Sequence, residues 1–394
     1  MSGAGTSVGA AETDPGRLLS AALLLLHLAA GPARAATCTD LVTLKLPHTS
    51  ITSAKVTEAG AFQLPTGSPR ADSSFFTAFQ TLAAFCRVQG VIRPAADSHI
   101  EFEVWLPLAG WNGRYVAAGN GSYSGSINYY RLAEAIQAGA VGSATDVGHK
   151  DAEPRWWAGH PERVRDFDYR AIHETAVQTR ALTKAFYGRP VAHAYFVSCS
   201  NGGRQGLVEA QRFPADYDGI LAGAPAYDFG ADLDGSGRVP AFNWRTPDLE
   251  AFKDRGGRLI IYHGGNDGPG ASTDFFRRLT DHMGRASVDD FARLYVVPGM
   301  GHCGGGAGPD PTDIGERLRP GLDAAHSVIR ALERWVEAGV APHEIVATKY
   351  QVEDEPSSGI VRTRPICPHP AVARWSGLGD RDDAATYSCE LPNR

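Results

Sequence analysis

The sequence lacks the features that mark nucleic-acid-binding, zinc-binding and fibrous proteins. It contains no run of Lys and Arg, and its net charge is −6, so nothing in it provides the basic surface that binding to nucleic acid requires. No C-x-x-C pair is present, which argues against a structural zinc site. Its 45 glycines and 25 prolines show no periodicity, which excludes a collagen-like chain. The length of 394 residues alone allows one large or two ordinary globular domains.

Long apolar segments are also scarce. Only residues 18–30 form one, and they are too few to span a bilayer comfortably. An arginine precedes this segment, and a small-x-small pattern that ends at Ala35 follows it, as in secretory signal peptides. We therefore expect residues 1–35 to be a signal peptide, cleaved after Ala35 or Ala36. The mature protein is then secreted or periplasmic and has no membrane partner.

All the cysteines lie beyond the expected signal peptide. An even number of cysteines in an exported protein argues for disulfide bonds, and six cysteines allow fifteen pairings. The six are Cys38, Cys86, Cys199, Cys303, Cys367 and Cys389.

Strand-like and helix-like segments alternate through most of the chain, which favours a mostly parallel sheet flanked by helices, the α/β class. Residues 40–53 are short and β-like, and residues 74–87 are apolar. The pattern predicts strands at 101–107, 115–118, 140–145, 217–226, 257–263 and 292–297. It predicts helices at 132–138, 168–187, 247–253, 273–283 and 322–338.

The most informative stretch is residues 195–210, which read as a strand, a tight run of small residues and a helix. A serine at such a turn is exposed above the sheet edge, beside the unpaired N–H groups of the helix N-terminus. Ser200 holds this place, within S-C-S-N-G, where the usual pattern is G-x-S-x-G. Ser198 replaces the first glycine, and Gly202 and Gly203 still allow close packing. The alternative is an ordinary strand-to-helix turn.

A serine nucleophile needs a base and a carboxylate that orients the base. Asp267 follows the expected strand 257–263, and His302 follows the expected strand 292–297. Ser200, Asp267 and His302 therefore occur in the chain order of α/β-hydrolases, each beyond the end of a strand.

Other residues compete for these roles. His263 lies on its strand, where a packed, hydrogen-bonded core histidine is the favoured interpretation. His149 sits at a strand end and is placed to line the site, although it precedes the nucleophile. Asp146 and Asp228 are possible carboxylates, less well placed than Asp267. The thiol of Cys199 is the rival nucleophile.

Two cysteines bear on this choice. Cys199 directly precedes Ser200, and Cys303 directly follows His302. If nucleophile and base meet, their neighbours lie within reach of a disulfide, whose Cα atoms are roughly 4.4–6.8 Å apart. A Cys199–Cys303 bridge would tie the two catalytic residues together and remove the thiol as nucleophile.

Several segments together resemble the tannase and feruloyl esterase family, in which the catalytic serine follows a bridged cysteine and the catalytic histidine precedes its partner. The similar segments are 199–204, 212–220, 252–257, 298–303 and 364–368. The resemblance implies an α/β-hydrolase fold, with residues 36–394 as a single catalytic domain.

The resemblance also implies residue roles. Ser200 is the nucleophile, His302 the base and Asp267 the orienting acid. The oxyanion hole is expected from the backbone N–H of Asn201 and from the glycine-rich loop 119–122, through Gly121 or Ser122. Two further disulfides are implied, Cys38–Cys86 and Cys367–Cys389.

One departure from the family is large. Members usually insert a lid domain between serine and aspartate, and this lid carries a calcium site and much of the acyl pocket. Here Ser200 and Asp267 are only 67 positions apart. Residues 228–246 are therefore expected to be a short connector in place of the lid. Asp232 and Asp234 match the start of a calcium loop, but the later ligands are missing, so we expect no metal and no cofactor.

The resemblance predicts a secreted serine carboxylesterase acting on small phenolic or aryl esters, of the feruloyl, galloyl or hydroxyethyl terephthalate type. Its partner is the ester substrate alone; the oligomeric state is not predicted. Two alternatives are an acyltransferase with the same triad and a remnant that binds aromatic esters without turnover. Aromatic side chains that are candidates to replace part of the lid are Tyr123, Tyr129, Trp156, Trp157, Tyr227 and Trp244.

Overall fold

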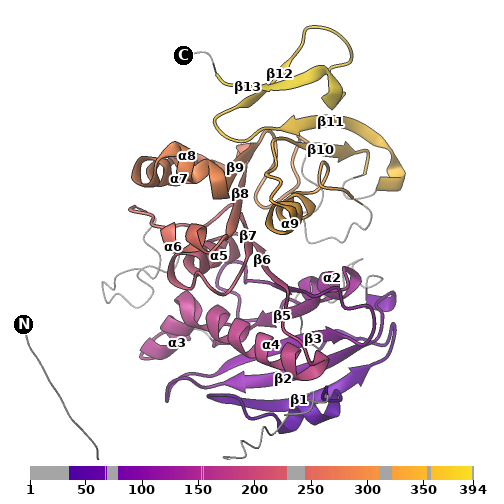
Figure 1. The fold of residues 1–394 in the computed structure, drawn as a ribbon, viewed down its shortest axis with the longest axis vertical. Helices are drawn as coiled ribbons and strands as arrows, with labels where there is room; N and C mark the ends of the chain where they lie inside the picture. Colours follow the sequence, from indigo (N-terminus) through magenta and orange to yellow (C-terminus); the bar gives the residue numbers. More distant parts are fainter. Residues whose placement is uncertain are drawn as a thin grey trace, which may run out of the picture. The chain divides into compact units, whose positions relative to one another are not determined.

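A mixed sheet organises the described part of the chain, in the strand order β1-β2-β3-β5-β4-β6-β7-β8-β9 (Figure 1). The computed structural model describes residues 35–392 except 67, 69–78, 152, 154, 229–244, 310–321 and 353–355. The strands are β1 (Thr49–Thr57), β2 (Phe85–Ile92), β3 (Ile100–Pro107), β4 (Arg114–Ala117), β5 (Val141–Thr145), β6 (His193–Cys199), β7 (Gly219–Gly223), β8 (Arg258–Gly264) and β9 (Ala292–Val297).

Six neighbouring strands, β5-β4-β6-β7-β8-β9, are parallel. The edge formed by β1, β2 and β3 is antiparallel. The predicted α/β-hydrolase class, with a mostly parallel sheet between helices, is therefore confirmed. Parallel strands end at the same edge of a sheet, so the loops after β6, β8 and β9 meet there.

Helices cover both faces of the sheet. They are α2 (Tyr129–Gln137), α3 (Pro161–Arg165), α4 (Ala171–Tyr187), α5 (Asn201–Arg212), α6 (Glu250–Asp254), α7 (Gly270–Met283), α8 (Arg285–Phe291) and α9 (Val328–Ala338). Short turns of other helical types are η1 (Thr39–Thr43), the π-helical η2 (Asp166–Arg170), η3 (Gly265–Asp267), η4 (Pro356–Ser358) and η5 (Ala384–Thr386). None of the described helices is long and apolar enough to cross a bilayer.

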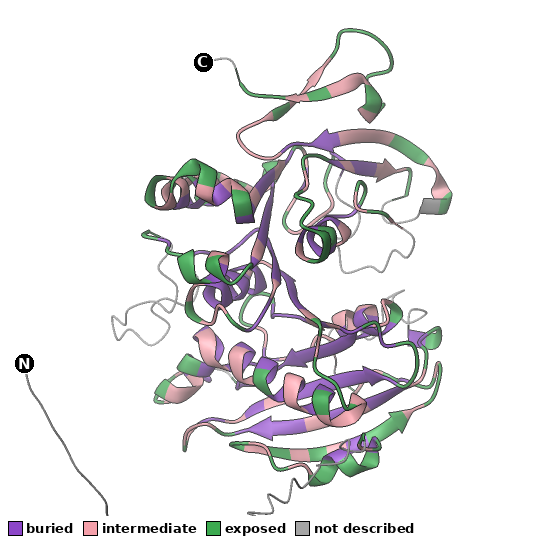
Figure 2. Cartoon of the chain, in the orientation of Figure 1, coloured by how far each residue is buried: buried purple, intermediate pink, exposed green. Residues whose placement is uncertain are grey.

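The alternation of side chains along β6 shows how the two faces are buried. Phe196 packs in the core cluster that contains Leu182 of α4 and Leu207 of α5. The next residue, Val197, points the other way and packs with Trp335 of α9. Because both faces of the strand are covered, β6 is buried along most of its length (Figure 2).

The described structure differs from the predicted elements at several places. Strand β2 was not predicted, because Arg87 and Gln89 interrupt its apolar pattern. Both side chains bind the carboxylate of Glu103 on β3, and this pairing lets polar residues occupy a central strand. Strand β3 itself is buried on both faces.

Three predicted helices begin later than expected. The helix predicted from residue 247 begins at Glu250. The helix predicted from residue 322 starts at Val328, where Ser327 caps it by accepting the N–H of Arg330. The helix predicted from residue 168 becomes α-helical only at Ala171, after the π-helical turn η2. The β-like segment 40–53 divides into the turn η1 and the start of β1.

Two small hairpins at the C-terminal end were not predicted. They pair β10 (Ile345–Tyr350) with β11 (Ile360–Ile366), and β12 (Val372–Trp375) with β13 (Tyr387–Glu390). The Cys367–Cys389 disulfide joins the end of β11 to β13, and Cys38–Cys86 joins the N-terminal turn η1 to β2. Both predicted pairings are confirmed.

Candidate active site

The turn between β6 and α5 holds Ser200 in a backbone conformation that is unusual for a residue with a side chain. Its φ is +64° and its ψ −125°. The Ser200 N–H donates to the carbonyl of Gly223 on β7, at 2.9 Å. The Ser200 carbonyl accepts the N–H groups of Arg204 and Ala226, each at 3.1 Å. Three backbone hydrogen bonds thus hold the turn in the strained form that is typical of an exposed nucleophile.

The small residues of the turn are required by close packing. A Cβ on Gly202 would lie 1.9 Å from the hydroxyl oxygen of Ser198. Serine in place of the first glycine of the motif is therefore accommodated, because the facing residue of α5 has no side chain.

Asp267 and His302 lie on loops that follow neighbouring strands, β8 and β9. The Nδ1 of His302 donates to Oδ2 of Asp267 across 2.6 Å. The His302 side chain is 51% exposed and that of Asp267 is 23% exposed, so the pair lies at the surface of the described structure. Because Nδ1 is hydrogen-bonded to Asp267, Nε2 is the ring nitrogen that is left for proton transfer.

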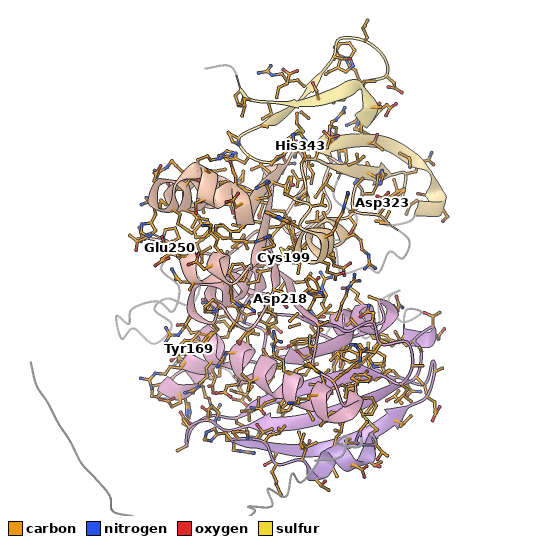
Figure 3. The ribbon with its side chains drawn as sticks, in the orientation of Figure 1. Tyr169, Cys199, Asp218, Glu250, Asp323 and His343 are labelled. Carbon is orange, nitrogen blue, oxygen red and sulfur yellow. A yellow bond between two sulfur atoms is a disulfide. The ribbon has the colours of Figure 1, made fainter. Side chains whose placement is uncertain are left out.

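The Cys199–Cys303 disulfide links this pair to the nucleophile turn. Cys199 is the last residue of β6 (Figure 3), and its Cα lies 5.9 Å from that of Cys303. The predicted bridge is confirmed, and no cysteine of the chain is left as a thiol, so the rival nucleophile is excluded. No hydrogen bond joins Ser200 Oγ to His302 within the described residues; such contacts often tighten only when substrate binds.

The loop predicted to contribute to the oxyanion hole is pinned from two sides. The Asn120 N–H donates to Oε1 of Gln205 on α5, and the Asn120 side chain donates to the carbonyls of Ser126 and Thr145, each at 3.0 Å. The Asn120 N–H is therefore already used. The predicted donors Gly121 and Ser122 come next, and a Cβ on Gly121 would meet only open space.

A cavity of about 190 Å³ adjoins this loop. Its wall combines the loop Gly119–Gly121 with the apolar side chains of Leu64 and Ile127 and the ring of Tyr129. Of the aromatic candidates named above that the structure describes, Tyr129 borders this cavity.

A buried ion pair supports the other predicted oxyanion donor, Asn201. The Arg204 guanidinium donates to Oδ1 of Asn201 at 2.8 Å and to Oδ1 of Asp168 at 2.9 Å. Burial lowers the pKa of Arg204, and the carboxylate of Asp168 opposes this effect. Sequence reasoning missed the pair; the only signal was the helical spacing of Asn201 and Arg204, because Asp168 lies far away in the chain.

The competing candidates take other places. His149 is buried, stacks on Trp156 with ring centroids 3.9 Å apart, and contacts the carbonyl of Tyr123 through Nε2. Asp146 is buried and accepts backbone N–H groups rather than a histidine. Asp228 lies 3.8 Å from Arg245. Asp267 is therefore the carboxylate that His302 meets.

His263 is buried and hydrogen-bonded, as predicted, and it also reaches the site. Its Nε2 lies 3.1 Å from Oδ2 of Asp267, the same oxygen that binds His302. Burial lowers the pKa of His263, although Asp267 opposes this, so the ring is held in its neutral form.

Other predicted features are distributed around the site or lie outside the described residues. Trp156 and Tyr227 are buried, whereas Tyr123 is partly exposed. Trp244, most of the connector 228–246, and both Asp232 and Asp234 lie outside the described residues. Within the described residues no three ligand side chains gather as a metal site, and the expected absence of calcium stays a prediction.

Comparison with known proteins adds relatives of this chain. A model of the tannase and feruloyl esterase family matches residues 86–239 and 238–390, and the two matches meet at residues 238–239. An uncharacterized esterase of Xanthomonas campestris pv. campestris is 28% identical over 536 aligned positions, covering 90% of this chain and 91% of the relative. A probable feruloyl esterase B-2 of Aspergillus terreus is 24% identical, covering 78% of this chain and 86% of the relative.

Solved structures share the fold. Feruloyl esterase B from Aspergillus oryzae superposes with a TM-score of 0.77 at 23% identity, over 90% of this chain and 99% of that one. A tannin acyl hydrolase from Aspergillus niger gives a TM-score of 0.66 at 18% identity, over 90% of this chain and 95% of that one.

Proposed function

Since this chain belongs to the tannase and feruloyl esterase family and is thus a carboxylic ester hydrolase, we propose that it is an exported serine esterase of small phenolic and aryl esters. The observation that carries the proposal is the 2.6 Å contact of His302 with Asp267, on a loop that a disulfide ties to the turn bearing Ser200. Feruloyl, galloyl and hydroxyethyl terephthalate esters are the substrate classes proposed.

The triad acts by acyl transfer. Ser200 Oγ attacks the ester carbonyl while Nε2 of His302 takes its proton, and the imidazolium then gives this proton to the departing alcohol. Water next attacks the acyl-enzyme, with His302 again as base. Asp267 accepts the Nδ1–H throughout, which fixes the tautomer and stabilises the imidazolium. This chemistry uses side chains and water and needs no cofactor.

Negative charge that develops on the carbonyl oxygen is met by backbone N–H groups. We assign these to Asn201, at the N-terminus of α5, and to Gly121 or Ser122. Arg204 and Gln205, both on α5, support the two sides of this hole by binding Asn201 and Asn120. Each such donor is typically worth about 3–4 kcal/mol of transition-state stabilisation.

We also propose that the lid of the family is absent and that residues 228–246 replace it as a short connector. The two matches of the family model meet within this segment. The alignment with the Xanthomonas esterase needs 536 positions although this chain has 394 residues, so the relative carries extra sequence. An enzyme without a lid excludes water less well and binds the acyl group less tightly, so we expect high KM values and broad acyl tolerance.

Three disulfides support export to an oxidising compartment, periplasmic or extracellular. The Cys199–Cys303 bridge makes this requirement functional as well as structural, because it joins the two loops that carry the nucleophile and the base.

The test is hydrolysis of methyl ferulate, methyl gallate, bis(hydroxyethyl) terephthalate and p-nitrophenyl acetate by the wild type and by Ser200→Ala. We expect turnover by the wild type and a loss of at least about a thousandfold in the variant. Equal rates for the two proteins would overturn the proposal. An added alcohol that captures most of the acyl product would identify an acyltransferase, and binding of the esters without turnover would identify a binding remnant.

A further inference from the structure

A line of buried polar side chains leads from the carboxylate of the proposed triad into the core. The Nε2 of His263 on β8 lies 3.1 Å from Asp267 Oδ2. On the other side of the ring, His263 Nδ1 lies 2.8 Å from Ser272 Oγ. The hydroxyl of Tyr227 in turn donates to Ser272 Oγ across 3.0 Å.

The protons along this line have only one consistent arrangement. An ionised carboxylate is an acceptor only, so the His263 nitrogen that faces Asp267 must carry the hydrogen. A neutral imidazole has one hydrogen, so Nδ1 is bare and accepts the hydroxyl hydrogen of Ser272. Ser272 gives its single hydrogen to His263, which leaves its lone pairs to accept the hydroxyl of Tyr227.

Burial makes this arrangement costly to disturb. Ser272 is fully buried, and His263 and Tyr227 are only 5% and 6% exposed. A buried polar atom that loses its partner costs roughly 1–3 kcal/mol. The three side chains come from β8, from the first turn of α7 and from the segment after β7, so they fix Asp267 relative to three separate parts of the core.

We propose that His263 is a positioning residue of the triad: its Nε2–H holds the Asp267 carboxylate in the orientation that meets His302, and Ser272 fixes the required tautomer of His263. The inference rests on the proposed esterase function. A second N–H at Oδ2 also reduces the affinity of that oxygen for a proton, so the proton shared with Nδ1 of His302 stays on the imidazole. The simple alternative is that His263 only fills space.

Paired substitutions separate the two roles. His263→Leu keeps an apolar side chain at the site and removes both ring nitrogens, whereas His263→Gln keeps an N–H donor with similar reach. We expect His263→Leu to lower kcat for an aryl ester at least tenfold with KM within about twofold, and His263→Gln to recover most of this loss. Equal kcat for His263→Leu and the wild type would overturn the proposal, and so would equal losses in both variants.

A change one step further from Asp267 tests the tautomer. Ser272→Ala leaves Nδ1 without its donor, so the ring is able to carry its hydrogen on Nδ1 and turn a bare Nε2 toward the carboxylate. We expect kcat to fall several-fold, while Thr273→Ala, the neighbouring position on α7, keeps the wild-type kcat. An unchanged kcat in Ser272→Ala would contradict the tautomer role.

A spectroscopic measurement does not depend on turnover. In wild-type protein labelled with ¹⁵N in the histidine rings, we expect His263 as the Nε2–H tautomer, assigned by comparison with His263→Gln. Finding the Nδ1–H tautomer, or a charged ring at neutral pH, would overturn the inference. Full activity of Ser200→Ala would instead overturn the esterase proposal and leave this tautomer result standing.

Discussion

Gly203 lies so close to the end of β7 that no side chain fits. A Cβ at this position would be 2.2 Å from the carbonyl oxygen of Gly223, which is the acceptor of the Ser200 N–H. The same carbonyl thus limits the approach of α5 and holds the nucleophile turn.

Gly203→Ala is therefore expected to push α5 away from β7 and to weaken the hydrogen bond of Ser200. We expect a loss of roughly 2 kcal/mol or more in the free energy of unfolding, together with lower kcat. Gly270→Ala is the control, because a Cβ there meets no atom within 4 Å, and its stability should stay within about 1 kcal/mol of the wild type. Urea unfolding of the three proteins is the measurement. A Gly203→Ala protein as stable as Gly270→Ala would show that the turn adapts.

The single residues of the candidate site differ in how well the sequence predicts them. Ser200, Asp267 and His302 each stand just after a strand, and that local signal is sufficient to name them. The contacts of His263 with Asp267 and of Arg204 with Asp168 depend on strand register and helix packing. These contacts form only when the chain is folded, so the spacing of the residues along the sequence does not predict them.

At the scale of elements, the disulfide between the end of β6 and the loop after β9 bridges 104 positions of sequence. Loop-closure entropy alone assigns such a bridge about 4–5 kcal/mol of stability. A second bridge, Cys38–Cys86, involves strand β2 near the antiparallel edge of the sheet; it bridges 48 positions and is assigned about 4 kcal/mol. Loop entropy thus assigns the two bridges similar stability, but of these two only Cys199–Cys303 joins the loops of the proposed nucleophile and base.

Removing each bridge separately distinguishes global stability from active-site geometry. We expect the double variant Cys199→Ala, Cys303→Ala to have a lower Tm and to lose most of its kcat. In the matched variant Cys38→Ala, Cys86→Ala, we expect a similar decrease in Tm and an unchanged kcat when it is assayed well below its Tm. Equal losses of kcat in the two variants would mean that Cys199–Cys303 acts only through stability.

A second link between elements depends on pH. His173 of α4 contacts Asp216, in the turn after α5, with Nδ1 and Oδ2 2.6 Å apart. Burial alone would lower the pKa of His173, but the hydrogen bond and charge of Asp216 outweigh it, so the pKa is raised. A raised pKa in the folded state means that the link stabilises fully below the unfolded-state pKa of about 6.5 and loses its contribution as pH rises above it.

His173→Gln should consequently destabilise the protein more at about pH 5.5 than at about pH 9. The free energy of unfolding, measured by urea at both pH values, gives the difference. His343→Gln, at an exposed position, is the control, and we expect its effect to be the same at both pH values. A His173→Gln effect that does not change with pH would exclude the charged link.

The elements that the sequence predicts well are the apolar parallel strands and the helices between them. Strand β2 was not predicted because Arg87 and Gln89 interrupt its apolar pattern. In the fold both side chains donate hydrogen bonds to Glu103 on β3. The hairpins β10–β11 and β12–β13 were not predicted because the side chains of β11, β12 and β13 are mostly exposed or half-buried and do not follow a buried pattern. Strand β10, by contrast, is buried at Ile345, Ala347 and Thr348. Hydrophobic patterns in a sequence indicate which side chains are buried. These strands, in contrast, are paired through their backbones, which leaves little trace in such patterns.

At the scale of the whole molecule, the described residues form one compact unit that begins at Ala35. Ala36 already belongs to it, because its N–H donates to the carbonyl of Ala185 at the end of α4. Residues 1–34 of the expected signal peptide, residues 1–35, lie outside the described residues.

We expect the exported protein to begin at Ala36 or Thr37, as intact mass and N-terminal sequencing of the protein from a periplasmic or culture fraction would show. Ala33→Lys should block processing, because the position three residues before the cleavage site needs a small side chain. Recovery of an exported protein that retains residues 1–35 would contradict the signal-peptide assignment.

Each of the three disulfides joins a cysteine to the next cysteine along the chain. Consider a polypeptide that enters an oxidising compartment with its N-terminus first. When the second cysteine of each pair emerges, the unpaired thiol that is already present is its native partner. Of the fifteen possible pairings, we therefore expect the native one to form by oxidation in order of arrival, with no need for reshuffling by an isomerase. On this route the loops of the proposed nucleophile and base are linked once Cys303 has emerged, before strands β10 to β13 follow.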